Sequence, residues 1–116
     1  MIKIVDDQIS REELVILADE TFKTMVKGVA DLERRVIAVG GSLHADAEAL
    51  LLENGSRQQD LWGFNINFND TLESSLEYTS MINIRPKDGN MSMHIKRVDI
   101  CEKVLALVRE RVRWQA

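Results

Sequence analysis

Hydrophobic and polar residues follow two different periods along the chain, and each change of period predicts a new element. Residues 2–5 form a short apolar run that is typical of a strand. Further on, apolar positions recur every three or four residues, which indicates a helix that buries one face. The positions of this face are Leu14, Leu17, Ala18, Thr21, Phe22 and Met25. Ser10 and Glu13 have the spacing of a capping box, so we expect the helix to begin directly after Ser10.

The period then changes to two, which is the period of a strand with one buried face. Residues 26–32 and 35–40 alternate in this way and predict a β-hairpin. The glycine pair at 40–41 permits a tight turn into a second helix over residues 44–54. That helix should stop at the Asn-Gly pair 54–55, because glycine adopts the left-handed conformation that ends many helices.

The clearest alternation lies in the second half of the chain. Residues 62–68 and 76–84 each alternate between apolar and polar positions, and a turn around residue 72 joins them. An antiparallel pair with Phe68 opposite Leu76 puts the apolar residues of both strands on one face. These two segments therefore predict a second hairpin.

A third helix is predicted at the C-terminus. Asp99 and Glu102 have the spacing of another capping box, with Asp in place of Ser. The apolar stripe that follows consists of Cys101, Val104, Leu105, Val108 and Val112. We expect Val104 and Val108 to lie in the core.

The order of elements (strand, helix, hairpin, helix, hairpin, helix) predicts an α+β domain over residues 1–116. We expect two layers, with a mainly antiparallel sheet of four to five strands and three helices on one face. The opening elements also fit a ferredoxin-like core extended by one strand and one helix. In that arrangement strands 35–40 and 61–68 run parallel, and His44 lies at the opposite end of the sheet from Arg85. Eight residues of strand would then separate them by roughly 25 Å.

Composition and charge narrow the classes of function. The chain is 45% apolar and 29% charged, with a net charge of −4, as expected of an ordinary globular domain. The net negative charge argues against nucleic-acid binding, which needs a basic surface. No apolar run is long enough to cross a membrane, and residues 1–7 do not form a signal sequence. The single cysteine fits a reducing, cytoplasmic compartment.

One candidate for chemistry stands at the start of the second predicted helix. His44 and Asp46 are both competent metal ligands. On a helix they point about 200° apart, so an ordinary role for Asp46 at the helix N-terminus competes with metal binding. Together with Arg85 they support one hypothesis, a small metal-dependent hydrolase or nuclease. No phosphate-binding or dinucleotide-binding motif is present, and we expect no cofactor.

Polar residues at strand positions support a second hypothesis, a non-enzymatic binding or interaction domain. Asparagine is depleted in strands, yet it occurs repeatedly in the second predicted hairpin, and Arg85 opens a turn-rich loop over residues 85–94. The predicted ligand-binding residues are Trp62, Asn65, Asn83, Arg85 and Asn90. Methionines 81, 91 and 93 lie in the same stretch and favour contact with a protein, such as a second copy in a homodimer.

Several motifs of the chain are similar to those of a known family. They are Gly40-Gly41-x-Leu43-His44-Ala45-Asp46-Ala47-Glu48, Gly55-Ser56, Asp60-Leu61-Trp62-Gly63-x-Asn65, Ser80-Met81-Ile82-Asn83-Ile84-Arg85-Pro86 and Gly89-Asn90-x-Ser92. Together they resemble a family of small uncharacterised bacterial and archaeal proteins, a domain of unknown function, from about residue 2 to residue 112. The resemblance implies a cytoplasmic single domain and assigns no catalytic residues. The arginines that the family has near Met91 and Met93 are not present here, which argues against an anion site in this loop.

Overall fold

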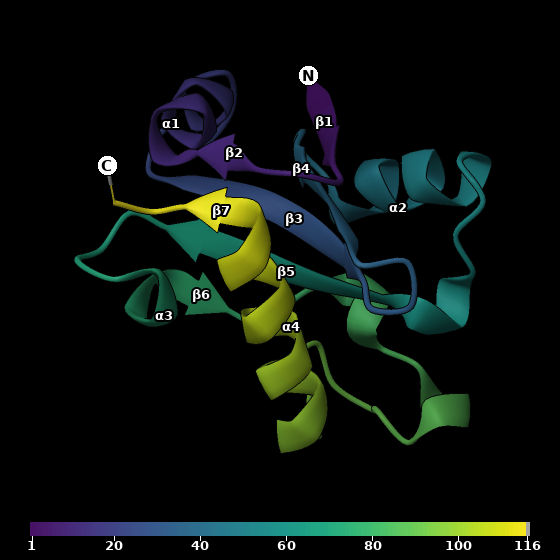
Figure 1. The fold of residues 1–116 in the computed structure, drawn as a ribbon. Coiled ribbons are helices and arrows are strands. Elements are labelled where there is room, and N and C mark those ends of the chain that lie inside the picture. The colour runs from purple at the N-terminus through teal and green to yellow at the C-terminus, as the bar shows by residue number, and fades with distance from the viewer. Residues whose placement is uncertain (116) are drawn as a thin grey trace.

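The computed structural model describes residues 1–115, and a five-stranded antiparallel sheet lies at its centre (Figure 1). In spatial order the strands are β1 (Ile2–Val5), β4 (Val36–Gly40), β3 (Met25–Asp31), β5 (Leu61–Asn67) and β6 (Leu76–Glu77). Two further strands, β2 (Ile9–Ser10) and β7 (Val112–Arg113), pair in parallel and form a small separate sheet. The helices are α1 (Arg11–Asp19), α2 (His44–Glu53), the single turn α3 (Leu72–Ser75) and α4 (Val98–Arg111). Three 3₁₀ turns, η1 (Gln58–Asp60), η2 (Met81–Asn83) and η3 (Pro86–Asp88), complete the chain.

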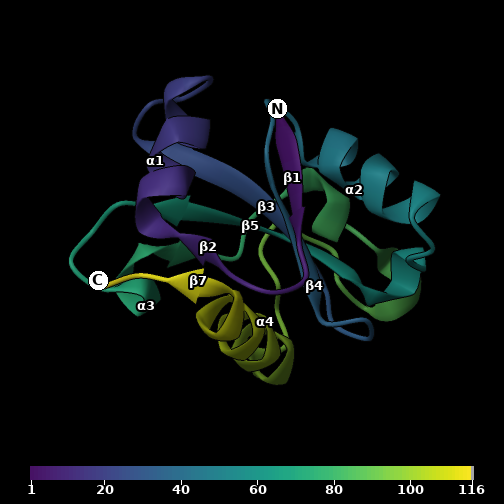
Figure 2. The ribbon, with the colours of Figure 1, turned by 45° about the horizontal axis from the view of Figure 1, so that its top comes forward.

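Helices cover both faces of the sheet (Figure 2). Because side chains alternate along a strand, Ile37 and Val39 of β4 join the core beneath α1 and α4. Val36 and Ala38 join a second core beneath α2. The α+β class and the predicted antiparallel sheet are confirmed, but the helices do not share one face. The continuous apolar run of β4 is the sequence signal for this, because a strand buried on both sides has no polar face.

The strand order differs from the ferredoxin-like alternative. That unit would pair the first and third strands in parallel, whereas β1 pairs with β4 in antiparallel fashion. Strands β4 and β5 do run in the same direction, since both are antiparallel to β3, which lies between them. The sheet is therefore a run of antiparallel neighbours with β3 at its centre.

The first helix begins as predicted and ends earlier. The Ser10 hydroxyl accepts from the Glu13 N–H at 3.1 Å, and the Glu13 carboxylate accepts from the Ser10 N–H at 3.4 Å. The helix stops at residue 19 instead of continuing to Met25. Lys23 adopts a left-handed conformation, with φ of 68°, and its N–H donates to the Ala18 carbonyl at 2.7 Å. Met25 then begins β3, where the pairing with β5 outweighs the helical pattern of the sequence.

The C-terminal helix starts one residue before the predicted cap. Arg97 is the N-cap, and Asp99 lies inside the first turn, where its carboxylate accepts from the Arg97 guanidinium at 2.6 Å. The predicted capping box at Asp99 is therefore wrong. Val104 and Val108 are fully buried, as expected. Within residues 1–115 no helix has both the length and the apolar character needed to cross a bilayer.

The prediction of a strand over residues 76–84 is wrong for most of its length. Only Leu76 and Glu77 form a strand, and Leu76 lies opposite Ile66 instead of Phe68. A shift of two residues keeps Leu76 and Glu77 on their expected faces, because the period of a strand is two. After β6 the chain leaves the sheet and wraps around the edge of β5 (Figure 1).

The alternation that predicted a strand has a different origin. Leu76 and Tyr78 pack into the core beneath α1 and α4, whereas Ile82 packs into the core beneath α2. The apolar residues of this segment therefore lie on opposite sides of the sheet. A segment that crosses the edge of a sheet contributes apolar residues to the cores on both faces of that sheet. The resulting sequence alternates between apolar and polar residues, as a strand with one buried face does.

We predict that Val108→Asp lowers the free energy of unfolding by about 3 kcal/mol or more, because it puts a charge in the apolar core. Val98→Asp is the matched control, since Val98 is 69% exposed and begins α4, where an acidic residue is favourable. Urea unfolding of both variants measures the difference. Equal urea midpoints for the two variants would show that Val108 is not part of the core.

Candidate functional site

The edge of β5 beyond β6 is covered by a side chain instead of a strand. Asn83 is fully buried, and its Oδ1 accepts from the Gly63 N–H at 2.8 Å. Its Nδ2 donates to the Gly63 carbonyl at 3.0 Å and to the Met93 carbonyl at 3.2 Å. A side-chain amide carries the same donor and acceptor as a peptide group. Asn83 therefore pairs with Gly63 as a residue of a neighbouring strand would.

The close approach of the 78–95 segment depends on glycine at position 63. A Cβ atom added to Gly63 would lie 2.5 Å from the Ser80 Cβ, a separation that atoms do not tolerate. Ser80 in turn donates its N–H to the Met93 carbonyl at 3.1 Å. The Ile95 N–H donates to the Tyr78 carbonyl at 3.0 Å. Residues 78–80 and 93–95 thus run side by side against β5.

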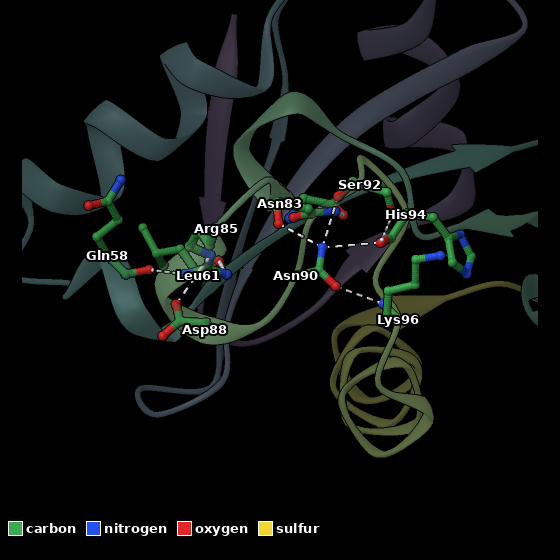
Figure 3. A network of polar contacts seen from close by, with 10 residues as sticks. Gln58, Leu61, Asn83, Arg85, Asp88, Asn90, Ser92, His94 and Lys96 are labelled. Carbon is green, nitrogen blue, oxygen red and sulfur yellow. Dashed lines mark hydrogen bonds and ion pairs between the residues drawn. The ribbon is translucent and has the colours of Figure 1, made fainter.

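The Asn90 side chain hydrogen-bonds the main chain of the loop that connects residues 78–80 with residues 93–95 (Figure 3). Its Nδ2 lies 2.7 Å from the Asn83 carbonyl, 2.9 Å from that of Ser92 and 3.1 Å from that of His94. Its Oδ1 accepts from the Lys96 N–H at 2.9 Å. One buried amide therefore fixes the positions of four main-chain groups.

Arg85 anchors the other end of the loop (Figure 3). Its Nη1 donates to the Gln58 carbonyl at 2.7 Å, and its Nη2 donates to the Leu61 carbonyl at 2.5 Å. The guanidinium lies 3.7 Å from the centroid of the Trp62 ring and 3.8 Å from the Asp88 carboxylate. Burial lowers the pKa of Arg85. The carboxylates of Asp88, Glu48 and Asp60 raise it and so oppose part of this effect. Its side chain is engaged with the main chain of the protein itself.

The five predicted ligand-binding residues do not form one pocket. Asn83, Arg85 and Asn90 use their polar atoms to attach the 78–97 segment to β5. Trp62 packs into the core beneath α1 and α4 and also lines a separate, charged hollow near the start of β5. Asn65 alone lines a hollow on the other face of the sheet.

That hollow is the strongest candidate for a binding site. It has a volume of about 540 Å³ and lies where the start of α2 meets the sheet and the 78–97 segment. Its lining consists of Met25, Lys27, Leu43, His44, Ala45, Asn65, Thr79, Ser80, Met81, Ile82 and Met93. Three of the five methionines of the chain are among these residues, and Leu43, Met81 and Met93 are exposed. We call this feature the methionine hollow.

His44 forms one wall of the methionine hollow. It is 7% exposed, and its Nε2 lies 2.8 Å from the Phe64 carbonyl. Because a carbonyl oxygen only accepts, Nε2 carries the hydrogen and Nδ1 carries the lone pair in the neutral ring. Burial lowers the pKa of His44, and the charge of Lys27 lowers it further, whereas contacts with the Phe64 carbonyl and the Asn65 side chain raise it. The net direction favours a neutral imidazole.

The contact with Phe64 corrects the expected position of His44. Strands β4 and β5 do run in the same direction, but α2 folds back over the sheet and puts His44 on the middle of β5. Leu61, which Arg85 contacts, precedes Phe64 by three residues, or about 10 Å of strand. The expected separation of a whole sheet length is wrong.

The structure does not bring the two predicted metal ligands together. His44 is buried on the sheet side of α2, whereas Asp46 is exposed and does not line the methionine hollow. Across residues 1–115, no three side chains of the His, Cys, Asp and Glu types are grouped so that they could hold a metal ion. A helix turns by about 100° per residue, so this separation follows from the spacing of the two residues.

Asn65 lines the hollow with a side-chain amide whose oxygen accepts no hydrogen bond from the described residues. Its Oδ1 is buried and has no partner, and its Nδ2 makes only a long contact of 3.4 Å with the Thr79 carbonyl. The depletion of asparagine in strands was the signal that singled out this residue. The sequence grouped Met81 and Met93, but it gave no signal that Met25 and Leu43 lie beside them, because these two residues are distant along the chain.

A second and larger hollow has a different character. Its volume is about 680 Å³, and it lies between the β3–β4 turn, η1, η3 and the start of α4. Its charged lining residues are Glu33, Arg35, Asp60, Lys87, Asp88, Arg97 and Lys103. Several of these already form ion pairs, Arg35 with Glu110 and Arg97 with Asp99. The near balance of charge in this groove indicates no particular ligand.

Comparison with known proteins identifies the family of the chain. The family model described as protein of unknown function, DUF5674, matches residues 3–111, and the chain belongs to this family. A search of curated proteins found no match, and neither did a search of solved structures.

We predict that Asn83→Ala lowers the free energy of unfolding by about 2–4 kcal/mol, because it leaves the Gly63 N–H and carbonyl without partners. Asn69→Ala is the control, since Asn69 is exposed. Urea unfolding measures both, and hydrogen exchange reports the Gly63 amide directly. An unchanged exchange rate at Gly63 in Asn83→Ala would contradict the pairing.

We also predict a pH dependence of stability that comes from His44. Its pKa in the folded chain lies below the ordinary value of 6.5, so the unfolded chain binds the proton more readily. The stability contributed by neutral His44 is complete above pH 6.5 and is lost as the pH falls. Between about pH 7.5 and about pH 5.5, the wild-type protein should lose more stability than His44→Gln. His94→Gln is the matched control, since His94 is exposed. Equal losses in all three proteins would contradict the assignment.

Proposed function

We propose that this protein is a non-enzymatic binding domain that takes an apolar group into the methionine hollow. The observation that carries the proposal is the composition of the lining, in which apolar side chains surround a few polar groups. Ligand pockets of proteins combine these features and have volumes of about 300–1,000 Å³. The polar residues along β5 and in the 85–94 loop support the proposal indirectly, because Asn83 and Asn90 fix the segment that forms one wall of the hollow.

The arrangement of polar groups supports binding in preference to hydrolysis. A hydrolase needs a base and a second catalytic group within reach of one reacting atom. Asp46 lies outside the hollow, and the Arg85 guanidinium binds the main chain at Gln58 and Leu61. The alternative hypothesis of a metal-dependent hydrolase or nuclease around His44 therefore has no observation in its favour.

The exposed rim of the hollow favours an adaptable interaction. Met81 is 73% exposed, Leu43 is 57% exposed and Met93 is 43% exposed. Methionine side chains are flexible and polarisable, and they adjust to ligands of irregular shape. A side chain of a protein partner, or of a second copy of this chain, is the competing occupant. A cytoplasmic location is part of the proposal, because the free thiol of Cys101 persists under reducing conditions.

The proposal predicts that a neutral apolar probe, n-octanol, binds in the hollow. With methyl-labelled methionine, octanol should shift the NMR signals of Met25, Met81 and Met93 and leave those of Met1 and Met91 unchanged. Met93→Asp should weaken binding by about tenfold or more, because it puts a charge in the apolar lining. Met91→Asp is the matched control, since Met91 is 70% exposed and does not line the hollow.

Two outcomes would count against this proposal. The absence of shifts at the three lining methionines would exclude the hollow as a binding site for apolar groups. Equal effects of Met93→Asp and Met91→Asp would show that the probe binds elsewhere. A dimer that octanol dissociates, detected by light scattering, would support the hollow and identify a second copy as its occupant.

A further inference from the structure

We propose that the ligand of the methionine hollow is a small apolar carboxylic acid whose carboxylate binds beside Lys27. This inference rests on the proposed function and adds the chemical class of the ligand. It follows from the charge of the lining, the position of Lys27 in the sheet and the lack of other anion-binding groups.

Lys27 is the only charged residue among the eleven that line the hollow. It makes no ion pair with any residue in the described part of the chain, 1–115. The protein as a whole has a net charge of −4, so this positive charge is a local feature. A half-buried cation beside apolar surface favours an anion as its partner, because water is partly excluded there.

The position of Lys27 is set by the sheet. It lies in β3 directly opposite Asn65 of β5, and both side chains point to the face that α2 covers. Its Nζ lies 5.1 Å from the centroid of the Phe22 ring, which is within the range of a cation–π contact. The lowering of the His44 pKa by Lys27 agrees with a positive charge at this wall of the hollow. A ligand that fills the hollow therefore has one end beside an ammonium group.

The single ammonium also limits the kind of anion. A phosphate group carries up to two charges and is bound in proteins by several donors, most often guanidinium groups or consecutive main-chain N–H groups. No arginine lines the methionine hollow. A carboxylate needs only one unit of positive charge, and the apolar lining accommodates the remainder of the molecule. An amine is disfavoured by repulsion from Lys27.

Three probes with the same apolar chain test this inference, namely octanoate, octanol and octylamine at pH 7.5. Calorimetry or NMR titration should give octanoate the highest affinity, at least about threefold above octanol, as for a partly exposed ion pair. Octylamine should bind most weakly. In Lys27→Met the preference for octanoate over octanol should disappear, while octanol still binds. Lys96→Met is the control, since it removes the same charge from an exposed position outside the hollow and should keep the preference.

The outcomes separate this inference from the proposed function. Equal affinities of the wild-type protein for octanoate and octanol would overturn the carboxylate assignment and leave the apolar hollow in place. Binding of none of the three probes would overturn both. Loss of the preference in Lys96→Met as well as in Lys27→Met would indicate a general effect of net charge and would also overturn the assignment. The comparison of probes on the wild-type protein does not depend on the stability of any variant.

Discussion

The amide of Asn83, paired with the main chain of Gly63, is the interaction on which the second half of the structure depends. It supplies a donor and an acceptor to the edge of β5 at the point where no strand continues the sheet. The same amide donates to the Met93 carbonyl and so links β5 to both arms of the segment that follows β6. Without this link, Met81 and Met93 would have no fixed position relative to Met25 in β3. The methionine hollow thus depends on this buried polar contact.

Two further polar residues complete this attachment. Arg85 binds the main chain at the start of β5, and Asn90 binds four main-chain groups within the loop. Each buried main-chain group would cost free energy if it were left without a partner. The network also covers the edge of β5, and an uncovered edge is a site at which strands of other chains can add. Asn83, Arg85 and Asn90, which the sequence predicted to bind a ligand, therefore stabilise the fold by binding the main chain.

The candidate site results from the meeting of three parts of the chain. The sheet provides Met25, Lys27 and Asn65, the start of α2 provides Leu43 and His44, and the attached segment provides Met81 and Met93. The hydrogen bond between His44 and the Phe64 carbonyl fixes α2 on the sheet. Burial lowers the pKa of His44 and so favours the neutral imidazole. The result is an apolar surface with one nearby positive charge. Such a surface is suited to binding, and it has no pair of groups arranged for acid–base chemistry.

The sequence by itself determined the elements whose pattern depends on neighbours in the chain. The capping box at Ser10, the hairpin of β3 and β4, helix α2 and strand β5 all follow from local spacing, and the structure has each of them. Only the tertiary structure decided the strand order, the path of residues 78–97 and the composition of the hollow. An asparagine that hydrogen-bonds a strand edge and one that contacts a ligand have the same sequence signature. What distinguishes them is the partner of the amide, which lies 20 residues away for Asn83 and Gly63 and is fixed only when the chain folds.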